Sequence, residues 1–118
     1  PGQTIYGASK AAVKLFTEGL HSEMAGTNVH VTIVFPGAIE TNIAQNSGAH
    51  IDTGKSRPSK TMKTTPATVA AEVIVDGIQR NSYRVLVGSD ARLMDFLSRA
   101  APKQAAAFIN KAMGSLLN

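Results

Sequence analysis

Tyr6 and Lys10, near the start of the 118-residue chain, are the first residues whose types and spacing could support chemistry. They are the only strongly polar, titratable groups within residues 5–13, and most of their neighbours are Gly, Ala or Ser. Side chains four positions apart lie on the same face of a helix. The pattern therefore predicts a phenol and an ammonium side by side, with room for a ligand to approach the helix closely.

A phenol beside an ammonium is a candidate general acid or base. A free phenol ionises near pH 10 and is a poor base at neutral pH, but a nearby positive charge favours the phenolate. Tyr6 would then move a proton, and Lys10 would make that transfer easier. The alternative is an ordinary exposed Tyr and Lys, because chance alone gives this spacing in about one chain in ten. The spacing by itself is weak support for catalysis.

The spacing of apolar residues predicts the elements that would position this pair. Helices are predicted over residues 4–25 and 66–81, with Thr65 as the N-cap of the second helix. Strands are predicted over residues 29–35 and 83–87, and a helix from Asp90 onward is broken at Pro102. The predicted apolar stripes comprise Ala8, Ala12, Leu15, Phe16, Leu20 and Met24 in the first helix, and Val69, Val73, Ile74 and Ile78 in the second.

This order of elements predicts an α/β fold. Apolar residues fall on both faces of the strand at 29–35, which is typical of a parallel sheet covered on both sides. A strand, helix and strand of this length form a βαβ unit with a right-handed crossover. Because two strands make a poor sheet and the chain begins at Pro1, we expect the C-terminal part of a larger, doubly wound, Rossmann-like parallel sheet. Ligands bind such sheets beyond the carboxyl ends of the strands, where Pro36 and Gly37 lie.

The connection at residues 38–65 is long and rich in polar residues, which is typical of a lid or binding loop. Its cluster of cations could contact phosphate, but a solvated loop is the favoured interpretation, and no aromatic residue is placed among them to stack on bases. The stretch Gly48–Ser56 resembles a phosphate-binding loop, but five residues separate its glycines where that motif has four. We therefore predict no nucleic-acid partner. The cations are Lys55, Arg57, Lys60 and Lys63.

Composition excludes several other classes of site. The chain has no cysteine, so it contains no disulfide or thiolate metal site, and this composition fits a cytoplasmic protein. No run of apolar residues approaches the 18 or so needed for a membrane span, so no membrane partner is expected. His21, His30 and His50 lack the spacing of metal ligands, and His30 is predicted to lie in a strand. No metal site is predicted.

The stretch that begins "YGASKAA" and continues to "FPGAIETNI" resembles the short-chain dehydrogenase/reductase family. The matching features are Tyr-x-x-x-Lys, a long helix, a strand, Pro-Gly and a Thr four residues after that Gly. The resemblance is close over residues 3–43 and looser through the second helix and "YRVLVGSDA". It implies an oxidoreductase that interconverts a small-molecule alcohol and carbonyl with NAD or NADP.

The resemblance also implies roles for individual residues. Tyr6 corresponds to the catalytic acid and base and also to a cofactor-binding residue. Lys10 corresponds to the residue that favours the ionised phenol and binds the nicotinamide ribose. Pro36 and Gly37 correspond to the turn beneath the nicotinamide. The backbone of Ile39 and the hydroxyl of Thr41 correspond to groups that hold the carboxamide and a phosphate.

The same resemblance predicts the organisation of the chain. Residues 1–118 would form the C-terminal part of a single NAD(P)-binding domain, in which residues 38–65 are the variable substrate lid and 90–118 the C-terminal helices. The complete protein is expected to be a homo-oligomer, because this family often pairs the Tyr-bearing helix across subunits.

Several motifs of the family are missing from these 118 residues. The glycine-rich phosphate loop, the residue that selects NAD or NADP, and the catalytic Ser all precede the Tyr in that family. We therefore expect the isolated chain to be inactive, and the choice of cofactor and substrate stays open. The alternatives are a non-catalytic binding or scaffold protein on the same fold, or a truncated remnant, in which Tyr6 and Lys10 have lost their roles.

Overall fold

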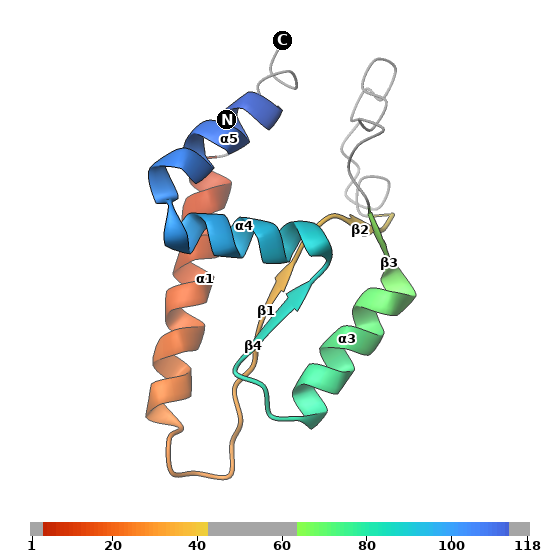
Figure 1. Ribbon diagram of the computed structural model, residues 1–118. Helices are drawn as coiled ribbons and strands as arrows, with labels where there is room; N and C mark the ends of the chain where they lie inside the picture. Colours follow the sequence, from red (N-terminus) through yellow and green to blue (C-terminus); the bar gives the residue numbers. More distant parts are fainter. Residues whose placement is uncertain (1–3, 43–63, 114–118) are drawn as a thin grey trace.

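The computed structural model describes residues 4–42 and 64–113 (Figure 1). Two parallel strand pairs and four helices make up this part of the chain. In chain order the elements are α1 (Thr4–Glu23), β1 (Ile33–Pro36), β2 (Ile39–Glu40), β3 (Thr65–Pro66), α3 (Ala67–Gln79), β4 (Arg84–Val87), α4 (Ser89–Ala100) and α5 (Pro102–Met113).

The two strand pairs confirm the predicted α/β class with parallel strands. Strands β1 and β4 pair in parallel, with Ile33 opposite Arg84 and Pro36 opposite Val87. Strands β2 and β3 form a second, shorter parallel pair. Helix α3 connects β3 to β4, as parallel pairing of β1 and β4 requires. Figure 1 shows α1 and α3 on either side of the central strands.

Successive side chains of β1 and β4 point to opposite faces of the sheet. One face packs against α3, where Ala70, Val85 and Val87 are buried and Val34, Val73 and Ile74 surround them. The other face carries Phe35, Arg84 and Leu86, which line a pocket shared with α1 and α4. The sheet therefore has an apolar face and a face with a partly buried charge, Arg84.

The inward face of α3 differs from the predicted stripe. Val73 and Ile74 pack on the core as predicted, but Val69 and Ile78 are exposed. Ala70 and Gly77 are buried instead, and a Cβ added at Gly77 would overlap the side chain of Val85. The helix turns its smallest residues toward β4 because they permit the closest approach of helix and strand.

The apolar stripe of α1 also lies differently from the prediction. No residue of α1 is buried, and the side chain of Phe16 is 71% exposed. The half-buried residues follow a neighbouring face that includes Lys14, Thr17 and Leu20. Helix α1 meets β1 across that more polar face. Within the predicted stripe, Ala8, Ala12, Leu15 and Phe16 are exposed, whereas Leu20 and Met24 are half-buried.

Several predicted boundaries are corrected. Helix α1 ends at Glu23, and β1 begins only at Ile33, so His30 lies before the strand and is exposed. Thr65 is not an N-cap: it pairs with Ile39 in β3, and Pro66 occupies the cap position without a side-chain hydrogen bond. The backbone of Thr65 is extended because its N–H donates to the carbonyl oxygen of Ala38.

Two further predictions concern the long connection and the C-terminal helices. The ends of residues 38–65 contribute to the β2–β3 pair, so this connection is not irregular throughout. The cationic cluster, the Gly48–Ser56 stretch and His50 lie outside the described residues. The helical break at Pro102 is confirmed, since α4 ends at Ala100 and α5 starts at Pro102. In the two described ranges, none of the helices combines the length and apolar character of a membrane crossing.

Candidate active site

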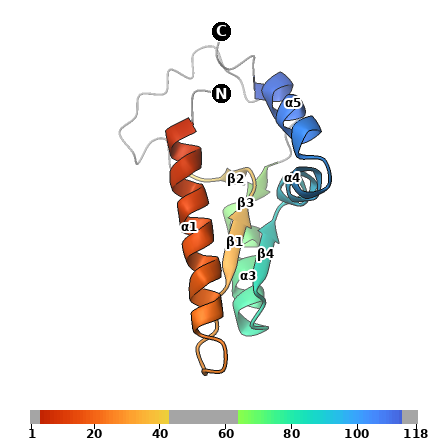
Figure 2. The same ribbon diagram turned by 90° about the vertical axis from the view of Figure 1, so that its left-hand side faces the viewer.

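The first turns of α1 and the carboxyl end of β1 lie at the same end of the molecule. Figures 1 and 2, which are turned by 90° about the vertical, both show the start of α1 and the chain following β1 toward the upper part of the structure. Helix α1 runs opposite to β1, so the helix begins where the strand finishes. The fold thereby places Tyr6 and Lys10 toward the same edge as the turn at Pro36.

Tyr6 and Lys10 share one face of α1, as their spacing predicts. The Lys10 Nζ atom lies 5.4 Å from the centroid of the Tyr6 ring. The Tyr6 side chain is 59% exposed, and Lys10 is exposed as well. Ser9, between them, donates a hydrogen bond from its hydroxyl to the backbone oxygen of Tyr6 at 2.7 Å. The phenol and the ammonium are thus adjacent and accessible to a ligand.

The turn after β1 is held from three directions. The N–H of Gly37 donates to the carbonyl oxygen of Val87 at 2.8 Å. The N–H of Ala38 donates to the carboxylate of Asp90 at 2.7 Å, and the carbonyl oxygen of Ala38 accepts from Thr65 at 2.8 Å. Strands β4 and β3 and helix α4 therefore all contribute to the position of this turn.

Ile39 and Thr41 continue the chain from that turn. Ile39 lies in β2, is half-buried and packs against the core formed with α3. Between them, Glu40 accepts a hydrogen bond from the hydroxyl of Thr64 at 2.6 Å. Thr41 follows β2 and is exposed. The Thr41 hydroxyl is therefore free of the core and accessible.

Asp90 is a residue that the sequence reasoning did not single out. The sequence feature that could have pointed to Asp90 is its position: an acidic residue in the first turn of a helix that follows the carboxyl end of a strand. Acidic residues are common at that position because they complement the helix dipole, so this signal does not by itself identify a role. Only the fold shows that its carboxylate reaches the turn after β1.

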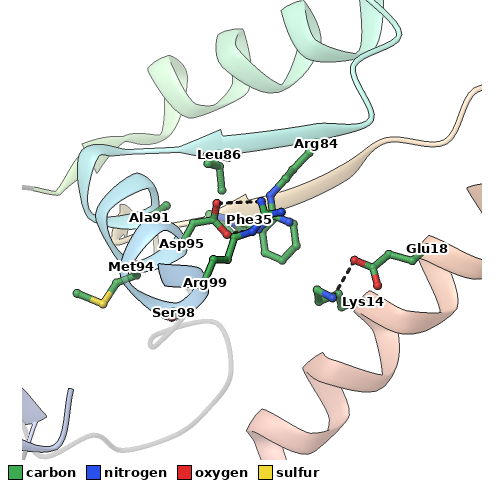
Figure 3. Close-up of a pocket in the computed structure, with 11 residues that line it drawn as sticks. Lys14, Glu18, Phe35, Arg84, Leu86, Ala91, Met94, Asp95, Ser98 and Arg99 are labelled. Carbon is green, nitrogen blue, oxygen red and sulfur yellow. Dashed lines mark hydrogen bonds and ion pairs between the residues drawn. The ribbon is translucent and has the colours of Figure 1, made fainter. Parts of the chain in front are cut away.

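A pocket of about 500 Å³ lies on the opposite face of the sheet from α3 (Figure 3). It contains Pro36 but neither Tyr6 nor Lys10, so we do not assign it to the predicted catalytic pair. An ion pair between Arg84 and Asp95 crosses it and joins β4 to α4, and a Lys14–Glu18 pair faces it from α1. Its lining residues are Lys14, Glu18, Phe35, Pro36, Arg84, Leu86, Ala91, Met94, Asp95, Ser98 and Arg99.

The donor groups of the predicted site fit a nicotinamide cofactor chemically. The Lys10 ammonium can donate three hydrogen bonds, and the Tyr6 and Thr41 hydroxyls can each donate and accept. Ribose hydroxyls and a carboxamide need this mixture of donors and acceptors. Within the described ranges, no group of three or more His, Cys, Asp or Glu side chains is arranged to hold a metal ion.

Comparison with known proteins adds an independent observation. Residues 1–52, which contain every predicted site residue, match the family described as short chain dehydrogenase. The chain belongs to the short-chain dehydrogenase family. Its Rossmann-like α/β architecture, with parallel strands and flanking helices, agrees with that membership.

Curated relatives of the chain are named as oxidoreductases or as short-chain dehydrogenases. The Mycobacterium tuberculosis protein named "Putative oxidoreductase SadH" is 38% identical over 105 residues, which cover 84% of this chain and 38% of that protein. An uncharacterized oxidoreductase of Streptomyces coelicolor is 34% identical over 99 residues, covering 84% of this chain and 35% of that protein. An uncharacterized short-chain type dehydrogenase/reductase of Sinorhizobium fredii is 46% identical over 43 residues, covering 36% of this chain and 17% of that protein.

The first two matches span 84% of this chain, but all three span well under half of the relatives. The chain spans 38% of the length of the Mycobacterium protein. No solved structure matches the chain.

Proposed function

We propose that the complete protein carrying this chain interconverts a small-molecule alcohol and its carbonyl, with NAD or NADP as the hydride carrier. The observation that carries the proposal is the exposed Tyr6–Lys10 pair, located at the end of the fold where the β1 strand finishes. The family membership and the names of the relatives support an oxidoreductase.

Tyr6 would handle the proton of the reaction. In the reductive direction, the phenol donates its proton to the carbonyl oxygen while the carbonyl carbon receives a hydride, and an alcohol results. In the oxidative direction, the phenolate accepts the hydroxyl proton as the hydride leaves the carbon. The bound cofactor supplies or accepts that hydride. Lys10 would stabilise the phenolate by its positive charge.

The remaining site residues would hold the cofactor. Lys10 would donate hydrogen bonds to the ribose hydroxyls. The turn at Pro36 and Gly37 would lie beneath the nicotinamide. The backbone of Ile39 and the hydroxyl of Thr41 would bind the carboxamide and a phosphate. Three hydrogen bonds fix this turn before any ligand binds, which favours tight and oriented binding.

The decisive test is Tyr6→Phe in the complete protein. We expect turnover to fall by about 100-fold or more, because the proton donor is lost, while the Kd of the cofactor stays within about twofold. Lys10→Ala should weaken both turnover and cofactor binding. Tyr83→Phe is the matched control, because Tyr83 is the other tyrosine of these 118 residues and its ring contacts His21 rather than the predicted site. Near-normal turnover in the Tyr6→Phe protein would contradict the role of Tyr6.

The isolated 118-residue chain should not catalyse hydride transfer, because the family's phosphate loop and catalytic Ser are not among its residues. A dehydrogenase assay on the purified chain tests this directly. Saturable oxidation of NADH or NADPH would show that the expectation is wrong.

We further propose a cytoplasmic homo-oligomer that binds neither nucleic acid nor membrane. The absence of cysteine fits a reducing compartment, and the exposed apolar stripe of α1 fits an association surface. Fractionation of the source cells and light scattering of the complete protein test these two points.

A further inference from the structure

Asp90 joins three elements at the carboxyl end of the sheet. It lies in the first turn of α4, and its Oδ2 atom accepts a hydrogen bond from the N–H of Ala38, 52 positions earlier in the chain, at 2.7 Å. Its Oδ1 atom is buried and has no hydrogen-bond partner among the described residues. The carboxylate therefore lies inside the junction of the β1 turn, β4 and α4.

Two glycines, Gly37 and Gly88, lie directly against the Asp90 carboxylate. A Cβ at Gly37 would overlap the Asp90 carboxylate, and so would a Cβ at Gly88. Gly88 has a φ of 99°, so its backbone alone favours glycine. Gly37 has no such left-handed conformation. Within the described structure, the three nearest atoms that a Cβ at position 37 would overlap all belong to the Asp90 carboxylate.

Asp90 supplies the one side-chain hydrogen bond among the three that hold the turn. The other two, Gly37 to Val87 and Thr65 to Ala38, join backbone groups. Without the carboxylate, the Ala38 N–H would lose its partner at a partly buried position. A loss of this contact would let the turn shift, and a shift of about 1 Å in a binding element can cost about 100-fold in rate.

We propose that Asp90 is the positioning residue for the turn at Pro36–Ala38, and that Gly37 is glycine to admit the Asp90 carboxylate. This inference rests on the proposed function, in which that turn lies beneath the nicotinamide. Asp90 does not touch the cofactor or substrate. It acts on them through the N–H of Ala38.

The first experiment compares Asp90→Ala with Asp90→Asn in the complete protein. We expect Asp90→Ala to raise the Kd of NADH or NADPH by about tenfold and to lower kcat/KM by about 10-fold to 100-fold. Asp90→Asn keeps an acceptor oxygen for the N–H of Ala38. Its Kd for the cofactor should therefore stay within about threefold of that of the original protein. Asp76→Ala is the matched control, because Asp76 is exposed and its ion-pair partner among the described residues is Arg80, the C-cap residue of α3.

Unchanged cofactor binding in Asp90→Ala would overturn the proposal. Equal losses in Asp90→Ala and Asp90→Asn would also overturn it, because the hydrogen bond to Ala38 would then not be what matters.

A double-mutant cycle tests the assignment of Gly37. Gly37→Ala should displace the carboxylate and reproduce the loss seen in Asp90→Ala. Adding Gly37→Ala to Asp90→Ala should then cost little more, because the carboxylate is already absent. Fully additive losses would show that Gly37 is required for another reason, such as direct contact with the cofactor, and would overturn this half of the proposal.

Hydrogen exchange separates this inference from the proposed function. The Ala38 amide should exchange faster in Asp90→Ala than in the original protein or in Asp90→Asn, whether or not a cofactor is present. If Ala38 responds in this way but no nicotinamide cofactor binds even the original protein, the positioning of the turn stands and the proposed function fails. If the exchange of Ala38 is unchanged, the positioning role is wrong.

Discussion

Arg84 shows how one partly buried charge can join a strand to a helix. Its guanidinium carbon lies 4.2 Å from the centroid of the Phe35 ring, and it pairs with Asp95 of α4. The Arg84 and Asp95 side chains are only 22% and 18% exposed. The aromatic face of Phe35 and the Asp95 carboxylate both stabilise the Arg84 cation. Together they offset the free-energy cost of removing that cation from water. The pair therefore fixes α4, and with it Asp90, relative to β4.

Asp95→Ala should reduce the free energy of unfolding by about 1 to 3 kcal/mol, because Arg84 would be left partly buried without its carboxylate. Asp76→Ala should change it by about 0.5 kcal/mol or less, because the Asp76–Arg80 pair is exposed. Urea denaturation of the complete protein measures both. Equal effects of the two substitutions would contradict this account of Arg84.

At the scale of elements, the contact between α3 and β4 depends on a glycine in the last turn of α3. Gly77 is buried, and a Cβ there would overlap Val85. Glycine costs a helix about 1 kcal/mol relative to alanine, so its presence is unfavourable for α3 taken alone. The close approach to β4, and the burial of Val85 and Val87 that accompanies it, offsets this cost.

Gly77→Ala should destabilise the protein by about 1 to 3 kcal/mol, because overpacking outweighs the gain in helix propensity. Gly19→Ala in α1 is the matched control: nothing described lies within 4 Å of a Cβ there, so we expect a gain of up to about 1 kcal/mol. Thermal melts of the two variants beside the original protein give the comparison. A stabilised Gly77→Ala protein would show that the helix and strand are not in tight contact.

At the scale of the whole molecule, several large apolar residues of α1 are exposed in the described part of the chain. Leu15 and Phe16 are 65% and 71% exposed, and Ile5 is more exposed still. Soluble proteins rarely expose contiguous apolar surface without a partner. Since the chain spans 38% of the length of the Mycobacterium relative, we expect other parts of the complete protein or a second copy to cover this stripe.

Phe16→Ser should therefore lower the thermal stability or the oligomer mass of the complete protein, because a covered Phe would be lost. Phe96→Ser is the matched control, since Phe96 is 67% exposed but belongs to α4 and not to α1. Differential scanning calorimetry and light scattering provide the readouts. If Phe16→Ser has no more effect than Phe96→Ser, the stripe is not a covered surface.

The sequence by itself determined the class of the fold and much of the predicted site. Helical periodicity and four-residue spacing are local properties, so they correctly placed Tyr6 and Lys10 on one face of α1. A β-branched apolar run ending in Pro-Gly likewise located β1 and the turn after it. The chemical roles of these residues stay predictions until the Tyr6→Phe and Lys10→Ala proteins are measured.

Only the tertiary structure decided which residues meet across the chain. The contact of Asp90 with Ala38 joins positions 52 apart, and the β2–β3 pair joins two short segments on either side of the long connection. Local periodicity could not predict that Gly77 and Ala70, rather than Val69 and Ile78, face β4. These outcomes depend on how closely whole elements approach one another, which is set by packing between distant residues and not by the pattern within any one segment.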